Sequence, residues 1–199
     1  MNILWLGPHR QNMIDSVTSG GDKVVHTEKR ITKDSAILKG INFIISYGYQ
    51  YIIKDNVLTK FPRRVINMHI SYLPWNKGKD PNMWSFLEDT PKGVTIHFID
   101  PGIDTGEIIA QEKVDFKPND TLRTSYTRLS TRIEQLFAHI WPEIKNCSIK
   151  SFAQQEEGSF HLAREKQTVE KYLHSGWDTP VVDLIGKRSK AKCLSNLQE

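Results

Sequence analysis

The chain has 199 residues, of which 38% are hydrophobic, 25% charged and 10% aromatic, with a formal net charge of +4. This composition is typical of a globular protein and excludes a disordered or fibrous one. No run approaches about 18 consecutive apolar residues, so no membrane-spanning segment is predicted. The length suits one domain with at most a small appendage.

The positive charge is concentrated near the C-terminus, where Lys187, Arg188, Lys190 and Lys192 lie close together. Without these four residues the chain is formally neutral. A basic tail of this kind is usually solvated, so the charge pattern favours a protein that does not bind nucleic acid.

Strand and helix signals alternate over the first seventy residues. The apolar run 3–7 follows no basic leader and is predicted to be a strand rather than a signal peptide. The other strands predicted here are 23–26, 41–48 and 65–70, and helical spacing occurs at about 9–18, 33–39 and 54–60. The alternation predicts an α/β fold: a mostly parallel sheet with helices on both faces and a ligand site at the strand ends.

The second half continues with a predicted helix at 80–89 and strands at 93–100 and 107–116. Residues 121–145 carry apolar side chains three and four positions apart, which predicts a long helix packed on the core. The pattern weakens after 150, with a short strand-like piece and a helix near 166–174. We therefore expect one domain over 1–150 and an extension over 151–199 that packs on it.

The two cysteines, Cys147 and Cys193, lack the spacing of a metal site and are predicted to be free thiols. His69 and His97 lie on two predicted strands, but no further ligand pattern surrounds them. Because a zinc site needs three or four converging ligands, a supporting role for His97 is the better interpretation, and no metal is expected.

Asn67 and His69 are polar residues inside the apolar strand signal 65–70. Residues two apart in a strand point to the same face, so the amide and the imidazole should project together. Burying both is costly unless they are hydrogen-bonded. An amide donor and a titratable ring suit attack on a carbonyl group, in which an oxyanion develops and protons move.

Two further segments carry polar side chains that have an ordinary explanation as well. Asp100 and Asp104 lie in a turn with proline and glycine, where aspartate often bonds its own backbone, and spacing alone favours that interpretation. Lys77 and Lys79 precede the helix predicted at 80–89, where they face either an anionic ligand or only water.

Taken together, the motifs resemble the folate-dependent formyltransferase family. The resemblance runs through Asn67-Met68-His69-Ile70-Ser71-Tyr72-Leu73-Pro74, then Gly78, Pro81 and Trp84, then Gly93-Val94-Thr95-Ile96-His97, and then Asp100-Pro101-Gly102-Ile103-Asp104-Thr105-Gly106-Glu107-Ile108. It implies a Rossmann-like domain that transfers the formyl group of N10-formyltetrahydrofolate, the only cofactor expected, to a primary amine.

The resemblance also implies roles for individual residues. The catalytic N-x-H element corresponds to Asn67 and His69, and the essential aspartate corresponds to Asp104. The residues implied to bind the formyl donor are Ser46, Tyr47, Gly48, Tyr49, Leu73, Asp100, Gly102 and Ile103. Those assigned to the acceptor are Lys77, Lys79 and Trp84; Lys77-Gly78-Lys79 stands where many members have Arg-Gly.

Members of the family differ in their acceptors. The chain looks too short for the extra domain of the enzymes that act on methionyl-tRNA. Residues 158–164 and 176–181 look more like sugar-modifying members than purine-pathway ones. We therefore expect an amino-sugar acceptor, either nucleotide-linked or a nonulosonic acid of the pseudaminic type.

Three alternatives stay open. One is formylation of glycinamide ribonucleotide, the second is hydrolysis of the formyl donor, and the third is a binding module without chemistry. We expect a cytoplasmic protein that acts on a small molecule, without nucleic-acid or membrane partners. The sequence leaves open whether it forms a homodimer.

Overall fold

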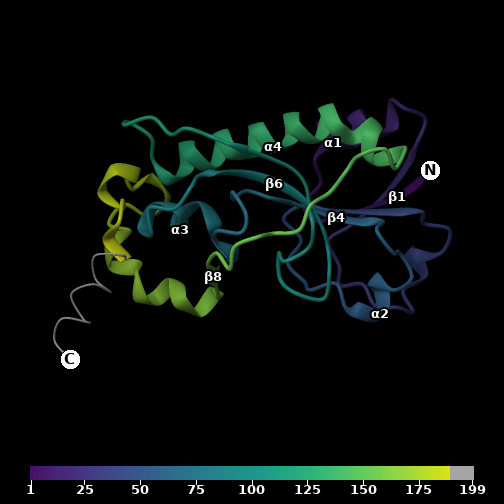
Figure 1. The fold of residues 1–199 in the computed structure, drawn as a ribbon, viewed down its shortest axis with the longest axis horizontal. Helices are drawn as coiled ribbons and strands as arrows, with labels where there is room; N and C mark the ends of the chain where they lie inside the picture. The colour runs from purple at the N-terminus through teal and green to yellow at the C-terminus, as the bar shows by residue number, and fades with distance from the viewer. Residues whose placement is uncertain (189–199) are drawn as a thin grey trace. The chain divides into compact units, whose positions relative to one another are not determined.

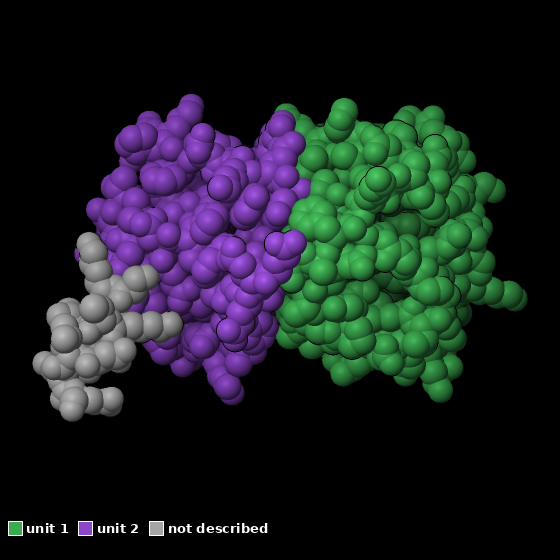
Figure 2. Space-filling view, in the orientation of Figure 1, with its two compact units in different colours: residues 1–69, 95–110, 133–154 green, residues 70–94, 111–132, 155–199 purple. Residues whose placement is uncertain are grey.

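The computed structural model describes residues 1–188, which form two compact units, coloured separately in Figure 2. Unit 1 comprises 1–69, 95–110 and 133–154, and unit 2 comprises 70–94, 111–132 and the described residues from 155 onward. Lys190, Lys192 and Cys193 lie outside the described residues. The boundary predicted at residue 150 stays a prediction.

Six strands of the described chain form a sheet in the order β2-β1-β3-β4-β6-β7. Their bounds are β1 Asn2–Leu6, β2 Lys23–Thr27, β3 Phe43–Ser46, β4 Val65–His69, β6 Gly93–Phe98 and β7 Ile108–Lys113. β2, β1, β3 and β4 pair with one another in parallel, whereas β6 pairs antiparallel with β4. The predicted α/β fold with a mostly parallel sheet is confirmed.

The central strands β1, β3 and β4 are mostly apolar and are buried on both faces, whereas the edge strand β2 is largely exposed or half-buried. Leu4 and Ile44 pack with Val57 of helix α2 (Asp55–Leu58) in one cluster. On the alternate positions, Phe43 meets Trp141 of the long helix α4 (Leu122–Lys145), with ring centroids 5.5 Å apart. Figure 1 shows α1 (Gln11–Thr18) and the end of α4 on the opposite side of these strands from α2.

Unit 2 contains helix α3 (Pro81–Leu87) and a small parallel sheet of β5 (Lys77–Gly78) and β8 (Phe160–His161). Gly78 has a φ of +89°, and a Cβ there would lie 2.3 Å from the carbonyl oxygen of His161. The two strands can therefore approach this closely only with glycine at position 78.

Three predicted helices are shorter than expected or divided. Residues 33–39 contain one 3₁₀ turn, Ala36–Leu38, which ends before Gly40 at a φ of +76°. Residues 54–60 contain the single turn of α2, which ends before a segment containing Pro62. The region 166–174 forms two 3₁₀ turns, Ala163–Thr168 and Glu170–Tyr172, instead of one helix. Helical spacing in short segments was thus a poor guide to length.

The described chain ends with two further 3₁₀ turns, Gly176–Asp178 and Val181–Asp183. No helix among residues 1–188 is long and apolar enough to cross a membrane. Cys147 is an exposed free thiol, as predicted.

Candidate active site

Neighbouring strands of unit 1 bring the polar residues of the site into one row. Ser46 at the end of β3 is paired with Asn67 of β4, and Asn67 is paired with His97 of β6. His69 is two residues beyond Asn67 in the same strand, on the same face as predicted. The row therefore places an amide and two imidazoles on adjacent strands.

Asp104 comes from the turn that follows β6. The carboxylate of Asp100 organises this turn by accepting bonds from the backbone N of Gly102 at 3.1 Å and from Oγ1 of Thr105 at 2.6 Å. A Cβ on Gly106 would lie 1.8 Å from the carbonyl oxygen of Phe98, so a side chain there would displace the backbone. Asp104 itself has a φ of +54°, in the left-handed region that aspartate tolerates.

The turn brings the Asp104 carboxylate to the polar row. Its Oδ1 lies 3.2 Å from Nδ2 of Asn67 and 3.4 Å from Nε2 of His97, and its Oδ2 lies 3.7 Å from Nδ1 of His69. The side chains of His69 and Asp104 are only 8% and 11% exposed. The structure thus brings together the three residues predicted to be catalytic.

His97 supports this cluster from the neighbouring strand. Its Nδ1 lies 2.8 Å from the carbonyl oxygen of Phe98, and because a carbonyl can only accept, Nδ1 carries the hydrogen. In the neutral ring Nε2 is then an acceptor, and Nδ2 of Asn67 donates to it at 3.3 Å. His97 therefore helps to orient the Asn67 amide.

The cluster offers an amide donor, a carboxylate and imidazoles within a few ångströms, which is suited to proton transfer beside a developing oxyanion. The Asn67 amide donates to both Asp104 and His97, so donation to a substrate requires exchange of one of these bonds. Among residues 1–188, no group of three or more His, Cys, Asp or Glu is placed to hold a metal ion.

The residues predicted to bind the formyl donor after β3 have mixed surroundings. Tyr47 is buried, with the Arg10 guanidinium 4.2 Å from its ring centroid. The Tyr49 hydroxyl donates to the carbonyl oxygen of Lys29 at 2.9 Å, and burial raises the pKa of its phenol. Gly48 is exposed, with a φ of +69°.

The other residues predicted to contact the formyl donor belong to both units. In unit 1, Ile103 is 37% exposed and adjoins Asp104 in the chain. In unit 2, Leu73 is buried, and its carbonyl oxygen accepts a bond from Nε2 of Gln111 at 3.0 Å. Their roles in binding stay predictions.

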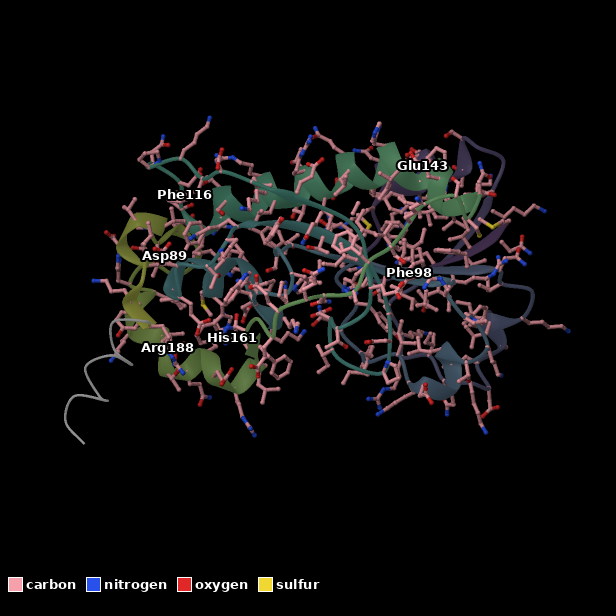
Figure 3. The ribbon with its side chains drawn as sticks, in the orientation of Figure 1. Asp89, Phe98, Phe116, Glu143, His161 and Arg188 are labelled. Atoms are coloured by element: carbon pink, nitrogen blue, oxygen red, sulfur yellow. The ribbon has the colours of Figure 1, made fainter. Side chains whose placement is uncertain are left out.

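The predicted acceptor residues lie in unit 2. Nζ of Lys77 donates to the carbonyl oxygen of Glu157 at 2.9 Å, and the backbone N of Lys79 donates to that of His161 at 3.0 Å. Trp84 is 1% exposed, and its ring stacks on His161 with centroids 4.0 Å apart. Arg188 covers the Trp84 ring at 5.6 Å; His161 and Arg188 are labelled in Figure 3. This burial does not support direct contact of Trp84 with an acceptor.

Sequence reasoning missed Gln154, whose Nε2 donates to the carbonyl oxygens of Asp104 and Gly106. It lies fifty residues after Asp104, in a segment where the pattern of the chain weakens. No local motif identifies such a residue, because the contact depends on the tertiary path of the chain.

Comparisons with known proteins identify structures of similar sequence and fold. The formyltransferase PseJ from Anoxybacillus kamchatkensis, solved in complex with UDP-4,6-dideoxy-4-formamido-L-AltNAc and tetrahydrofolate, is 53% identical to this chain. The match covers 94% of this chain and 100% of that one, with a TM-score of 0.93.

More distant structures share the fold. An N-formyltransferase from Helicobacter canadensis, in complex with folinic acid and dTDP-3-aminofucose, is 23% identical, with a TM-score of 0.73, 94% of this chain covered and 80% of that one. Phosphoribosylglycinamide formyltransferase from Bacillus halodurans is also 23% identical, with a TM-score of 0.59, 69% of this chain covered and 92% of that one.

The formyl transferase family matches residues 25–140, which contain Asn67, His69 and Asp104. This match spans more than half of the chain, and the likeness to the Anoxybacillus enzyme extends it to nearly the whole length. The chain therefore belongs to the formyl transferase family, as its motifs predicted.

Proposed function

We propose that this protein transfers the formyl group of N10-formyltetrahydrofolate to the primary amine of a nucleotide-linked amino sugar. The observation that carries the proposal is the 53% identity to an enzyme whose structure holds a UDP-linked formamido sugar and tetrahydrofolate. Removing the formyl group from that sugar gives a UDP-linked 4-amino-4,6-dideoxy sugar, which is the first acceptor to test. Of the two amino-sugar classes predicted, this identity favours the nucleotide-linked one.

The reaction requires a new bond between the amine nitrogen and the formyl carbon, and breakage of the bond between that carbon and N10. The folate supplies an activated formyl group when it is bound. The amine must arrive neutral, and it loses one proton while N10 gains one. The protein therefore has to stabilise negative charge on the formyl oxygen and to move one proton.

Asn67 and His69 are assigned to the formyl oxygen. Both lie on one face of β4, so their side chains project to the same side of the sheet. One Asn67 bond, to Asp104 or His97, is exchanged for the bond to the formyl oxygen. Replacing Asn67 with Ala is expected to lower kcat about 100- to 1,000-fold, the usual effect of losing one oxyanion donor.

Asp104 is assigned to proton transfer. Its carboxylate lies beside the imidazoles of His69 and His97, and imidazole is a side-chain group that can accept and release a proton. Asp104 orients the His69 ring, so a proton can pass from the amine toward N10 through His69 or a water molecule.

The proposal extends to the setting of the reaction. We place it in the cytoplasm, with small molecules as the substrates and without nucleic-acid or membrane partners. A pseudaminic-type pathway is the finer proposal, suggested by the name of the Anoxybacillus relative.

The decisive experiment measures tetrahydrofolate formation from N10-formyltetrahydrofolate with three acceptor classes: UDP-4-amino-4,6-dideoxy sugars, free nonulosonic acids bearing an amine, and glycinamide ribonucleotide. Mass spectrometry identifies the formamide product. Turnover with the UDP sugar alone supports the proposal. Preference for glycinamide ribonucleotide, or release of formate without any acceptor, would overturn it.

A further inference from the structure

The segment 151–154, which we call the Gln154 segment, runs along the turn that carries Asp104. The Gln154 side chain uses both hydrogens of its amide: Nε2 donates to the carbonyl oxygen of Asp104 at 2.8 Å and to that of Gly106 at 3.0 Å. Its Oε1 is buried without a hydrogen-bond partner among the described residues. The amide is therefore placed for donation to the turn alone, at the cost of an unsatisfied acceptor.

The rest of the segment is attached to the residues that follow the turn. Phe152 and Ile108 exchange two backbone hydrogen bonds, at 2.8 and 3.0 Å. Oγ of Ser151 donates to Oε2 of Glu107 at 2.5 Å, and the guanidinium of Arg63 donates to both groups at 2.8 Å. Gln154 thus projects from an anchored piece of backbone, which limits its freedom to move away.

The geometry of the turn explains why such an anchor matters. The φ of +54° at Asp104 is a left-handed conformation that most residues other than glycine avoid. Asp100 organises the turn from inside through Gly102 and Thr105, but these bonds do not hold the Asp104 carbonyl. The bond from Gln154 fixes the plane of the peptide after Asp104, and with it the direction of the Asp104 side chain.

We infer that Gln154 is a positioning residue for formyl transfer, which holds the Asp104 carboxylate against Asn67 and His69. The inference rests on the proposed function, because it assigns Gln154 a share in the same reaction. Gln154 acts only through Asp104, since its donors are bound to the turn. A misplacement of about 1 Å in a catalytic group can cost on the order of 100-fold in rate.

The test compares Gln154→Met with Gln155→Met in kinetics with the UDP-amino sugar. Methionine keeps the length of the side chain but removes both donors, and Gln155 is an exposed neighbour that serves as the matched control. We expect kcat to fall about 10- to 100-fold in Gln154→Met. The KM values of both substrates should stay within about twofold. Gln155→Met should match the wild type, and an unchanged kcat in Gln154→Met would overturn the inference.

A double mutant separates positioning from a general loss of structure. In the Asp104→Asn background, Gln154→Met should change kcat by less than about twofold, because the group that it positions is already gone. A loss as large as in the wild-type background would show that Gln154 acts elsewhere and would reject the inference. If Gln154→Met does not fold, Gln154→Asn, which keeps the amide but shortens its reach, takes its place in both comparisons.

Hydrogen exchange supplies a measurement that needs no substrate. Amides of residues 102–108 should exchange faster in Gln154→Met than in Gln155→Met, while those of β1 and β3 stay protected. Equal exchange in the two variants would contradict the anchoring of the turn. Failure of the wild-type enzyme to formylate the UDP sugar, with the exchange difference present, would count against the proposed function and not against the anchor.

Discussion

Two aspartates with little exposure, one in each compact unit, have opposite surroundings. Asp104 lies beside an amide and two imidazoles, at 3.2 to 3.7 Å. Asp120, whose side chain is 4% exposed, accepts bonds from both Nη atoms of Arg128 at 2.7 and 2.8 Å and from the backbone N of Lys117 at 2.6 Å. Both carboxylates are organised, but by groups of different chemistry.

The difference separates a group that can react from one that stabilises the fold. A guanidinium keeps its proton under all ordinary conditions, so the pair of Asp120 and Arg128 stores no exchangeable proton. Imidazoles gain and lose protons near neutral pH, so Asp104 has neighbours that can take part in proton transfer. Burial alone would not distinguish the two carboxylates.

The largest expected effect is that of Asp104→Asn on the reaction. The amide carries no negative charge and cannot take up a proton as the carboxylate can, so kcat should fall about 100- to 10,000-fold, the range for losing a general acid or base. The melting temperature should change little, because an amide can still bond with Asn67 or His97. Asp34→Asn, at an exposed position of unit 1, is the control. A kcat close to that of the wild type would remove the distinction between the two aspartates.

Asp120→Asn should show the reverse pattern. It removes the charge from bonds to Arg128, Thr124 and Lys117, and hydrogen bonds to charged groups are each worth about 1.5–3 kcal/mol. We expect the free energy of unfolding in urea to fall by about 2–3 kcal/mol, with an unchanged kcat. Asp115→Asn, at an exposed position nearby, should leave both quantities unchanged. A lower kcat in Asp120→Asn at full stability would break the comparison.

The Asp120 carboxylate should also contribute to the loss of folding stability at low pH. Burial raises the pKa of Asp120, but the bonds from Lys117, Arg128 and Thr124 outweigh it and hold the pKa below its usual value. Its stabilisation is therefore complete above the unfolded pKa of about 3.9 and is lost as the pH falls through the lower folded value. Urea unfolding between about pH 6 and pH 3 should show a smaller decline for Asp120→Asn than for the wild type. Parallel declines would mean that Asp120 is not responsible.

The smallest effect concerns the acceptor residues of unit 2. Trp84→Phe weakens the stacking on His161 and should lower the free energy of unfolding by about 1 kcal/mol. Because Trp84 is buried, the KM of the UDP sugar should stay within about twofold of the wild type. Trp177→Phe, at an exposed ring, is the control. A marked rise in KM without loss of stability would instead support the direct contact predicted from the sequence.

The parts of the fold that could be predicted are those that local patterns encode. Apolar runs such as 41–48 and 65–70 predicted the central strands, because a buried parallel strand must be apolar on both faces. Short helices could not be predicted well, since one or two turns depend on packing more than on spacing. The region 166–174 is the clearest example.

The residues of the site also divide into those that a local sequence pattern predicts and those that it does not. The shared face of Asn67 and His69 follows from strand geometry, so their pairing could be predicted from two positions. The approach of Asp104 depends on a turn, and only the family resemblance singled it out from Asp100. Gln154 could not be found at all, because its partners lie about fifty residues away and only the folded chain brings them together.

The turn that carries Asp104 is closed at its base. The backbone N of Phe98 donates to the carbonyl oxygen of Glu107 at 2.9 Å. This hydrogen bond joins the two residues that flank the segment 99–106. Ile99, at its start, also donates from its backbone N to the carbonyl oxygen of Val65 at 2.9 Å, which ties the segment to β4. For protein engineering, substitutions in this segment should therefore be confined to exposed positions such as Pro101 and Ile103, which leave the bonds of Asp100 and the close packing at Gly106 unchanged.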